Sequence, residues 1–204
     1  MSSLDKLIKY FETFPGIGAR QARRFAFHIL TMKKEDVSEF STLISSLQDT
    51  VVECQSCRRF FAQNGHQNLC RICSDETRDH TKLLIVERDS DIQSIERSGV
   101  YEGLYFVLGG TVPLLDSIEA KNLRGGSLKR TITERLSADL SEVILGFSIN
   151  PDGENTARFI ESVIADIPEA KSLTVSHLGR GLSTGSELEY ADPETIKSAL
   201  QNRH

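Results

Sequence analysis

The sequence predicts a multi-part α+β protein of 204 residues: a helical N-terminal region, a small cysteine module, an α/β domain and a C-terminal strand-helix segment. Three observations predict this arrangement. Apolar residues recur at helical spacing before residue 50, four cysteines form two Cys-x-x-Cys pairs, and apolar and helical segments alternate after residue 81. We expect the parts to span residues 1–52, 53–74, 81–177 and 178–204.

The N-terminal region is predicted to contain three amphipathic helices, over residues 3–13, 19–31 and 35–50. In the second helix the spacing predicts inward positions for Ala22, Phe25, Ala26, Ile29 and Leu30. In the third it predicts inward positions for Phe40, Leu43, Ile44 and Leu47.

Pro15-Gly16-Ile17-Gly18 separates the first two helices and is typical of a helix-hairpin-helix. Gly16 and Gly18 allow a tight turn, so that backbone N–H groups at the start of the next helix can meet a DNA phosphate. Three arginines follow: Arg20, Arg23 and Arg24. The alternative is a plain helical corner with solvated arginines, but the local basic cluster favours DNA.

The charge distribution supports this assignment, although the formal net charge of the chain is −5. Residues 1–34 hold seven basic and two acidic side chains, whereas residues 81–176 hold ten basic and fifteen acidic ones. A basic end joined to an acidic body can bind phosphates locally and offer the other end to protein partners.

The cysteines are Cys54, Cys57, Cys70 and Cys73, with twelve residues between the two pairs. This spacing is typical of a closed, tetrahedral, structural Zn²⁺ site. Disulfides are the alternative, but they need an oxidising compartment, and the N-terminus opens on no apolar signal stretch. His66 is expected to be a solvated loop residue, and the default location is the cytoplasm, with no membrane span.

Strands of a parallel sheet are predicted at residues 83–86, 104–108, 143–145 and 173–175, and helices at 91–98, 127–138 and 155–165. The glycine-rich segment Gly179–Gly185 lacks the lysine of a phosphate-binding loop, so we expect a flexible connection or an interface. A short strand is predicted at 188–190, with Leu188 and Tyr190 inward, and a closing helix from Pro193.

Carboxylates follow two of the predicted strands. Glu87, Asp89 and Asp91 follow the first, and Asp152 and Glu154 follow the third. At the carboxyl edge of a parallel sheet they can gather around Mg²⁺. Alternatively, Asp91 and Asp152 are helix caps, and the spacing does not separate the two readings.

The order of these motifs closely resembles the RecR family of bacterial recombination mediators over essentially the whole chain. The resemblance lies in Phe14–Gly18, Arg24–Ala26, the four cysteines, Ile85–Asp91, Tyr105–Gly110, Asp152–Ala157, Arg180–Leu182 and Gly185–Asp192. It implies a helix-hairpin-helix, a Cys₄ zinc finger, a Toprim domain and a C-terminal segment that serves as an oligomer interface.

The resemblance also implies a non-enzymatic DNA-repair role. Members of the family act with RecO and RecF to load RecA on gapped DNA, as dimers or ring-like tetramers that encircle DNA. It implies DNA contacts at Arg20 and Arg24, and Toprim acidic positions at Glu87, Asp91, Asp152 and Glu154.

Toprim enzymes carry an Asp-x-Asp pair where this chain has Asp152-Gly153-Glu154. We therefore interpret the acidic cluster as a retained fold feature or a protein-contact surface. The alternative function is a Mg²⁺-dependent Toprim nuclease or primase with Glu87 as general acid/base and Asp91, Asp152 and Glu154 as metal ligands. A nucleotide-binding regulator is disfavoured because the glycine-rich segment has no suitable lysine.

Overall fold

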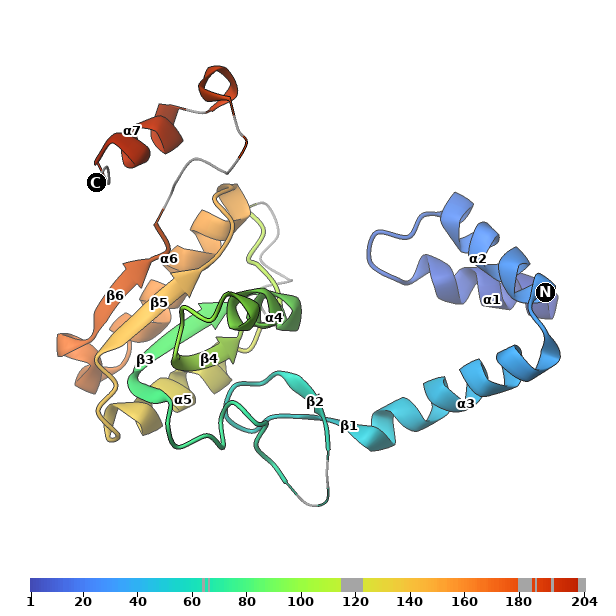
Figure 1. Cartoon of the computed structure of the whole chain (residues 1–204), viewed down its shortest axis with the longest axis horizontal. Coiled ribbons are helices and arrows are strands. Elements are labelled where there is room, and N and C mark those ends of the chain that lie inside the picture. The colour runs from blue at the N-terminus through green and yellow to red at the C-terminus, as the bar shows by residue number, and fades with distance from the viewer. Residues whose placement is uncertain are drawn as a thin grey trace. The chain divides into compact units, whose positions relative to one another are not determined.

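The chain forms two compact units, Met1–Val52 and Glu53–His204, in the computed structural model shown in Figure 1. The structure describes residues 1–204 except 64, 66, 115–122, 180–184, 186, 192 and 202–204. The predicted loop residue His66 and most of the glycine-rich segment therefore lie outside the described residues.

The first unit contains the three predicted helices: α1 (Ser3–Glu12), α2 (Ala19–Thr31) and α3 (Lys34–Thr50). Helix α1 begins with a capping box in which Ser2 and Asp5 bond each other's backbone N–H groups. Helices α1 and α2 form a hairpin (Figure 1), with the Phe11 and Phe25 rings edge to face at 5.8 Å. Ala22 and Ala26 are fully buried, as their spacing predicted.

The apolar face of α3 is exposed, which contradicts the prediction that it packs inward. Its four large apolar side chains are 42–59% exposed: Phe40, Leu43, Ile44 and Leu47. Phe25 and Leu30 on α2 are also exposed, at 42% and 67%. Periodicity identifies an apolar face but not the segment that covers it, and no segment of the first unit buries this one.

The second unit is built on a parallel four-stranded sheet with the order β4-β3-β5-β6. Its strands are β3 (Asp79–Val86), β4 (Gly103–Val107), β5 (Glu142–Gly146) and β6 (Thr174–His177). Val86 pairs with both Val107 and Gly146, so the carboxyl ends of β4, β3 and β5 meet at one edge of the sheet. A smaller sheet pairs β1 (Val51–Glu53) with β2 (Phe60–Ala62).

Both faces of the four-stranded sheet are apolar because β3 and β4 alternate buried side chains between them. Leu83 and Ile85 pack on one side with α5 (Gly125–Leu136) and α6 (Pro151–Ala165), through Leu128, Ile132 and Ile160. This face has the helical cover expected of a parallel sheet.

The opposite face is covered by α4 (Asp89–Ser98) together with the cysteine module. Leu84, Val86, Tyr105 and Val107 form one buried cluster with Ile92 of α4. The same cluster contains Cys54, Cys57, Cys70 and Ile72. The cysteine module is therefore part of the core of the α/β domain.

The C-terminal part contains the 3₁₀ turns η2 (Pro168–Ser172) and η3 (Leu188–Tyr190) and helix α7 (Pro193–Gln201). The predicted short strand at 188–190 is wrong, as is the inward placement of Leu188 and Tyr190, which are 64% and 81% exposed. Three residues are too few for alternation to separate a strand from a turn. Among the described helices, none is long and apolar enough to cross a membrane.

The start of α6 depends on a glycine in the Asp-Gly-Glu motif. The Asn150 side chain accepts a 2.7 Å hydrogen bond from the Gly153 N–H. A Cβ atom at position 153 would lie 1.9 Å from the Ser148 carbonyl oxygen, whereas at Gly126 of α5 it would meet nothing within 4 Å.

We therefore expect Gly153→Ala to lower the free energy of unfolding by about 2–3 kcal/mol, because the backbone at Ser148 must move. The matched variant Gly126→Ala should change it by less than about 1 kcal/mol, in the stabilising direction. Urea denaturation of both proteins measures the difference. Equal midpoints would contradict the tight approach at Gly153.

Candidate metal centre and candidate nucleic-acid interface

The four cysteines lie together as a single cluster whose sulfur atoms are all within 4.8 Å of one another. Cys57 and Cys70 sulfurs are 3.6 Å apart, and Cys54, Cys57 and Cys70 are at most 1% exposed. The first pair is folded by a turn in which the Arg58 N–H bonds the Cys54 carbonyl, and Arg58 has a left-handed φ of 64°. In the second pair the Ser74 N–H bonds the Cys70 carbonyl.

This donor set fits a structural metal ion. Among the described residues no histidine or carboxylate joins the group, so the ligands are four soft thiolates. Such a set completes a tetrahedron around Zn²⁺ and leaves no position for a catalytic water. The centre can hold a metal and fasten the two cysteine pairs together, but it offers no open coordination site for substrate.

Without metal, some of the four thiols keep their protons. Hydrogen bonds from the thiols of Cys57, then Cys70 and Cys73, lower the pKa of Cys54. The hydrogen bond that Cys57 makes to Cys54 is the largest of the effects that raise the pKa of Cys57. Metal binding must therefore release thiol protons, so metal affinity decreases as the pH falls.

Polar contacts fasten the cysteine module to the sheet and to α4. The Val107 N–H of β4 donates to the Cys57 carbonyl at 2.8 Å, and the Asp89 carboxylate of α4 accepts from the Phe60 N–H at 2.7 Å. Arg124 forms a 2.7 Å ion pair with Glu53 and donates to the Val107 carbonyl at 3.0 Å. Sequence reasoning missed these roles of Asp89 and Arg124, since the partners are distant in the chain.

The hairpin between α1 and α2 has the geometry of a type II turn, with Pro15 second and Gly16 third. The Ile17 N–H bonds the Phe14 carbonyl at 3.0 Å, and Gly16 has a φ of 74° that strongly favours glycine. Gly18 caps α2 without any side-chain hydrogen bond. The N–H groups in the first turn of α2 therefore face no capping side chain, and they can donate hydrogen bonds to an anion.

The arginine cluster of α2 is exposed. Arg20, Arg23 and Arg24 all lie on the surface, and Arg24 donates a 3.3 Å hydrogen bond to the neighbouring Gln21 side chain. Arg20 and Arg24 are four residues apart and so share a face of the helix. Together with the hairpin N–H groups they form a positive surface suited to a phosphate backbone.

The carboxylates predicted at the sheet edge make separate contacts within the protein. Glu87 forms a 2.6 Å ion pair with Arg88, whereas Asp91 accepts from the Arg88 N–H at 2.8 Å and completes the cap of α4. Asp152 accepts from the Leu114 N–H at 3.1 Å, and the side-chain cap of α6 is Asn150. The capping interpretation therefore holds for Asp91 and not for Asp152.

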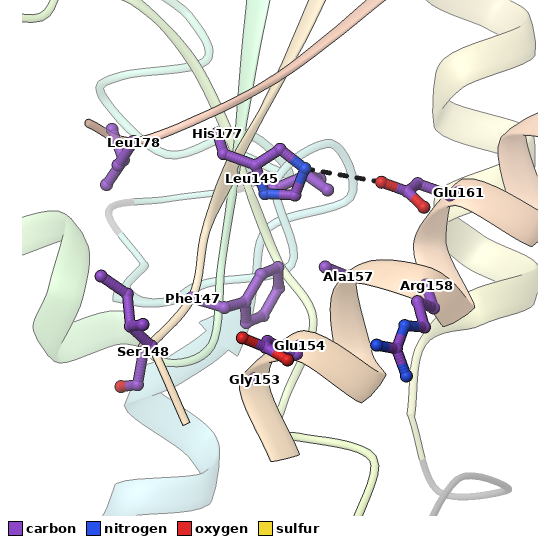
Figure 2. Close-up of a pocket in the computed structure, with 11 residues that line it drawn as sticks. Leu145, Phe147, Ser148, Gly153, Glu154, Ala157, Arg158, Glu161, His177 and Leu178 are labelled. Atoms are coloured by element: carbon purple, nitrogen blue, oxygen red, sulfur yellow. Dashed lines mark ion pairs between the residues drawn. The ribbon is translucent and has the colours of Figure 1, made fainter. Parts of the chain in front are cut away.

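These carboxylates do not gather into a cation site. In the described ranges of the chain, the cysteines alone bring three or more potential ligands within 4.8 Å. The sheet edge has instead a pocket of about 360 Å³ (Figure 2), which the ends of β5 and β6 line together with α6. Glu154 and Arg158 border it from α6, and His177 lies 3.5 Å from Glu161.

Comparison with known proteins links the parts of this chain to one family. A model described as RecR, helix-hairpin-helix matches residues 4–47, a Toprim domain model matches residues 81–178, and a model of the RecR C-terminal region matches residues 181–204. "Recombination protein RecR" of Streptococcus thermophilus is 36% identical over 200 residues, which cover 98% of this chain and 96% of the relative. The protein of the same name from Mycolicibacterium smegmatis is 36% identical over 201 residues, with the same coverage.

We expect loss of the metal to destabilise the α/β domain as well as residues 53–74, because the cysteines belong to the core beneath β3 and β4. Binding of structural zinc contributes about 10–16 kcal/mol of folding free energy in small peptides. A loss of even ~3 kcal/mol of folding free energy would lower the melting temperature here by roughly 6–12 °C. Cys70→Ser should lower the melting temperature similarly, because it removes a metal ligand. Ser74→Ala, at an exposed site of the same segment, should change the melting temperature little. Thermal melting with metal analysis tests this, and an unchanged curve after confirmed metal removal would contradict it.

Proposed function

The chain belongs to the RecR family of recombination proteins, and from this premise we propose that it is a recombinational DNA-repair mediator. In this proposal it binds DNA without reading sequence, as an oligomeric clamp, and acts with RecO and RecF to load RecA on gapped DNA. The observation that carries the DNA contact is the exposed arginine cluster beside an uncapped helix start.

The mechanism is geometric. The N–H groups at the start of α2 and the guanidinium groups of Arg20 and Arg24 contact phosphates, which are the same at every base pair. One such hairpin binds weakly. Several hairpins in one assembly engage the same DNA at a high effective concentration, so the assembly holds DNA firmly without sequence preference.

An oligomer is supported by the exposed apolar side chains. Phe40, Leu43, Ile44 and Leu47 leave the α3 face uncovered, and Leu188 and Tyr190 are exposed in the C-terminal segment. We propose that further copies of the chain cover these surfaces in a homodimer or homotetramer, since contiguous apolar patches mark interaction sites. The acidic α/β domain then remains available to partner proteins in the bacterial cytoplasm, near the nucleoid.

We further propose that the protein acts without catalytic turnover. The four cysteines hold a structural Zn²⁺, which can supply folding energy and no open coordination site. Glu87, Asp91 and Asp152 each have a hydrogen-bonding or ionic partner within the protein, which supports a role in the fold or in partner contact. The competing function, a Mg²⁺-dependent nuclease or primase, requires that these groups gather around a cation.

Replacing Arg20 and Arg24 by alanine should weaken DNA binding equally on unrelated sequences. Two lost phosphate contacts should also reduce the slope of log affinity against log salt by about 1.8 on duplex, at ~0.9 per contact. A salt series of equilibrium binding measures both effects. The control is Lys129→Ala with Arg130→Ala, two exposed cations on α5. If the hairpin variant and the control bind alike, the hairpin is not the DNA contact.

End-labelled gapped DNA incubated with the zinc-loaded protein and Mg²⁺ should remain intact, at concentrations where a native gel shows binding. This outcome is expected because the mediator positions DNA and makes no bond. Shortened or extended DNA on a denaturing gel, lost in Glu87→Gln, would instead establish the Toprim edge as an active site.

A further inference from the structure

A groove of about 840 Å³ lies between the cysteine module and α4. Its apolar lining is contributed by Phe61, Ile72 and Ile92, and three arginines border it: Arg59, Arg71 and Arg97. Two of these arginines belong to the cysteine module and the third to α4. The volume falls within the ~300–1,000 Å³ typical of ligand sites.

The charge of the groove is strongly positive. Its one lining carboxylate, Glu96, is already paired with Arg78 and accepts a 2.7 Å hydrogen bond from Tyr105. Burial raises the pKa of Glu96, but the hydrogen bonds from Arg78 and Tyr105 lower it below its usual value, so Glu96 is ionised and neutralised by Arg78. Within the described ranges, no carboxylate forms an ion pair with Arg59, Arg71 or Arg97.

Arg59 is held by packing, without an acceptor for one of its donors. Its Nε is buried and has no hydrogen-bond partner among the described residues. A buried donor without a hydrogen-bond partner lowers the free energy of unfolding by about 1–3 kcal/mol, so this arginine reduces the stability of the protein.

The metal centre accounts for only part of this positive charge. Four thiolates around Zn²⁺ have a formal net charge of −2. Arg59 lies two residues after Cys57 and Arg71 directly after Cys70, so both can also stabilise the metal-loaded centre. Arg97 is on α4, outside the module. It is exposed, and its Nε donates only to the Gln93 carbonyl of its own helix.

We propose that this groove is a second DNA contact, which binds the phosphate backbone of a single-stranded segment. Guanidinium groups bind phosphates in bidentate fashion, and a basic groove with an aromatic side chain is typical of single-strand binding. Phe61, half-buried among the arginines, offers a ring for a base. The inference extends the proposed DNA-binding function but does not depend on the hairpin.

The test uses the full-length, zinc-loaded protein and a fluorescein-labelled thymidine oligonucleotide of about 20 nucleotides, longer than the ~4–16 of a typical site. Arg71→Glu with Arg97→Glu should weaken binding by roughly tenfold or more and reduce the salt slope by about 1.4, at ~0.7 per contact. Lys129→Glu with Arg130→Glu is the control, since it makes the same change in net charge on exposed positions of α5. Fluorescence anisotropy over a salt series gives both quantities.

Equal losses in the groove variant and the control would overturn the proposal, because the effect would then be that of net charge alone. Arg71→Glu could also release zinc, so the single variant Arg97→Glu is measured as well. If Arg97→Glu binds the oligonucleotide with unchanged affinity, the proposal is overturned too. Displacement of the oligonucleotide by polyglutamate at equal charge concentration would also overturn it and indicate an acidic protein segment. A hairpin variant (Arg20→Ala with Arg24→Ala) measured in parallel shows separately whether the hairpin contact fails.

Discussion

The second unit of this protein depends on the packing of the cysteine module against one face of the parallel sheet. Strands β3 and β4 are buried on both faces, and helices α5 and α6 cover only one of them. On the other, Cys54, Cys57 and Cys70 pack with Leu84 and Val86 and leave a single helix, α4, to complete the layer. A metal ion bound by the cysteines would therefore stabilise the sheet as well as the cysteine module itself.

The same packing explains the arrangement of the acidic residues after β3. Asp89 accepts the Phe60 N–H from the module, Asp91 caps α4, and Glu87 pairs with Arg88. These groups join the module, the strand end and the helix to one another. A carboxylate committed to such a contact is less available to a cation, which supports a scaffold over a phosphoryl-transfer site at this edge.

The surfaces that remain exposed divide the chain by function. In our proposals, the phosphate contacts belong to the hairpin and to the groove beside the metal centre. Uncovered apolar side chains belong to α3 and to the C-terminal segment, where Leu188 and Tyr190 are exposed. Weak, sequence-independent DNA contacts hold DNA firmly only when several copies of the chain act together. The proposed DNA-binding surfaces therefore depend on the apolar surfaces that would join the copies.

Much of this protein was determined by local sequence pattern. The spacing of the cysteines predicted their cluster, helical periodicity gave α2 its bounds of 19–31, and apolar runs located the four strands, because residues a few positions apart constrain one another directly. Only the tertiary structure decided that α3 is exposed, that residues 188–190 form a turn, and that Asp89 bonds Phe60, 29 positions away. Each of these depends on which distant segment covers a face or supplies a donor, and periodicity does not encode that choice.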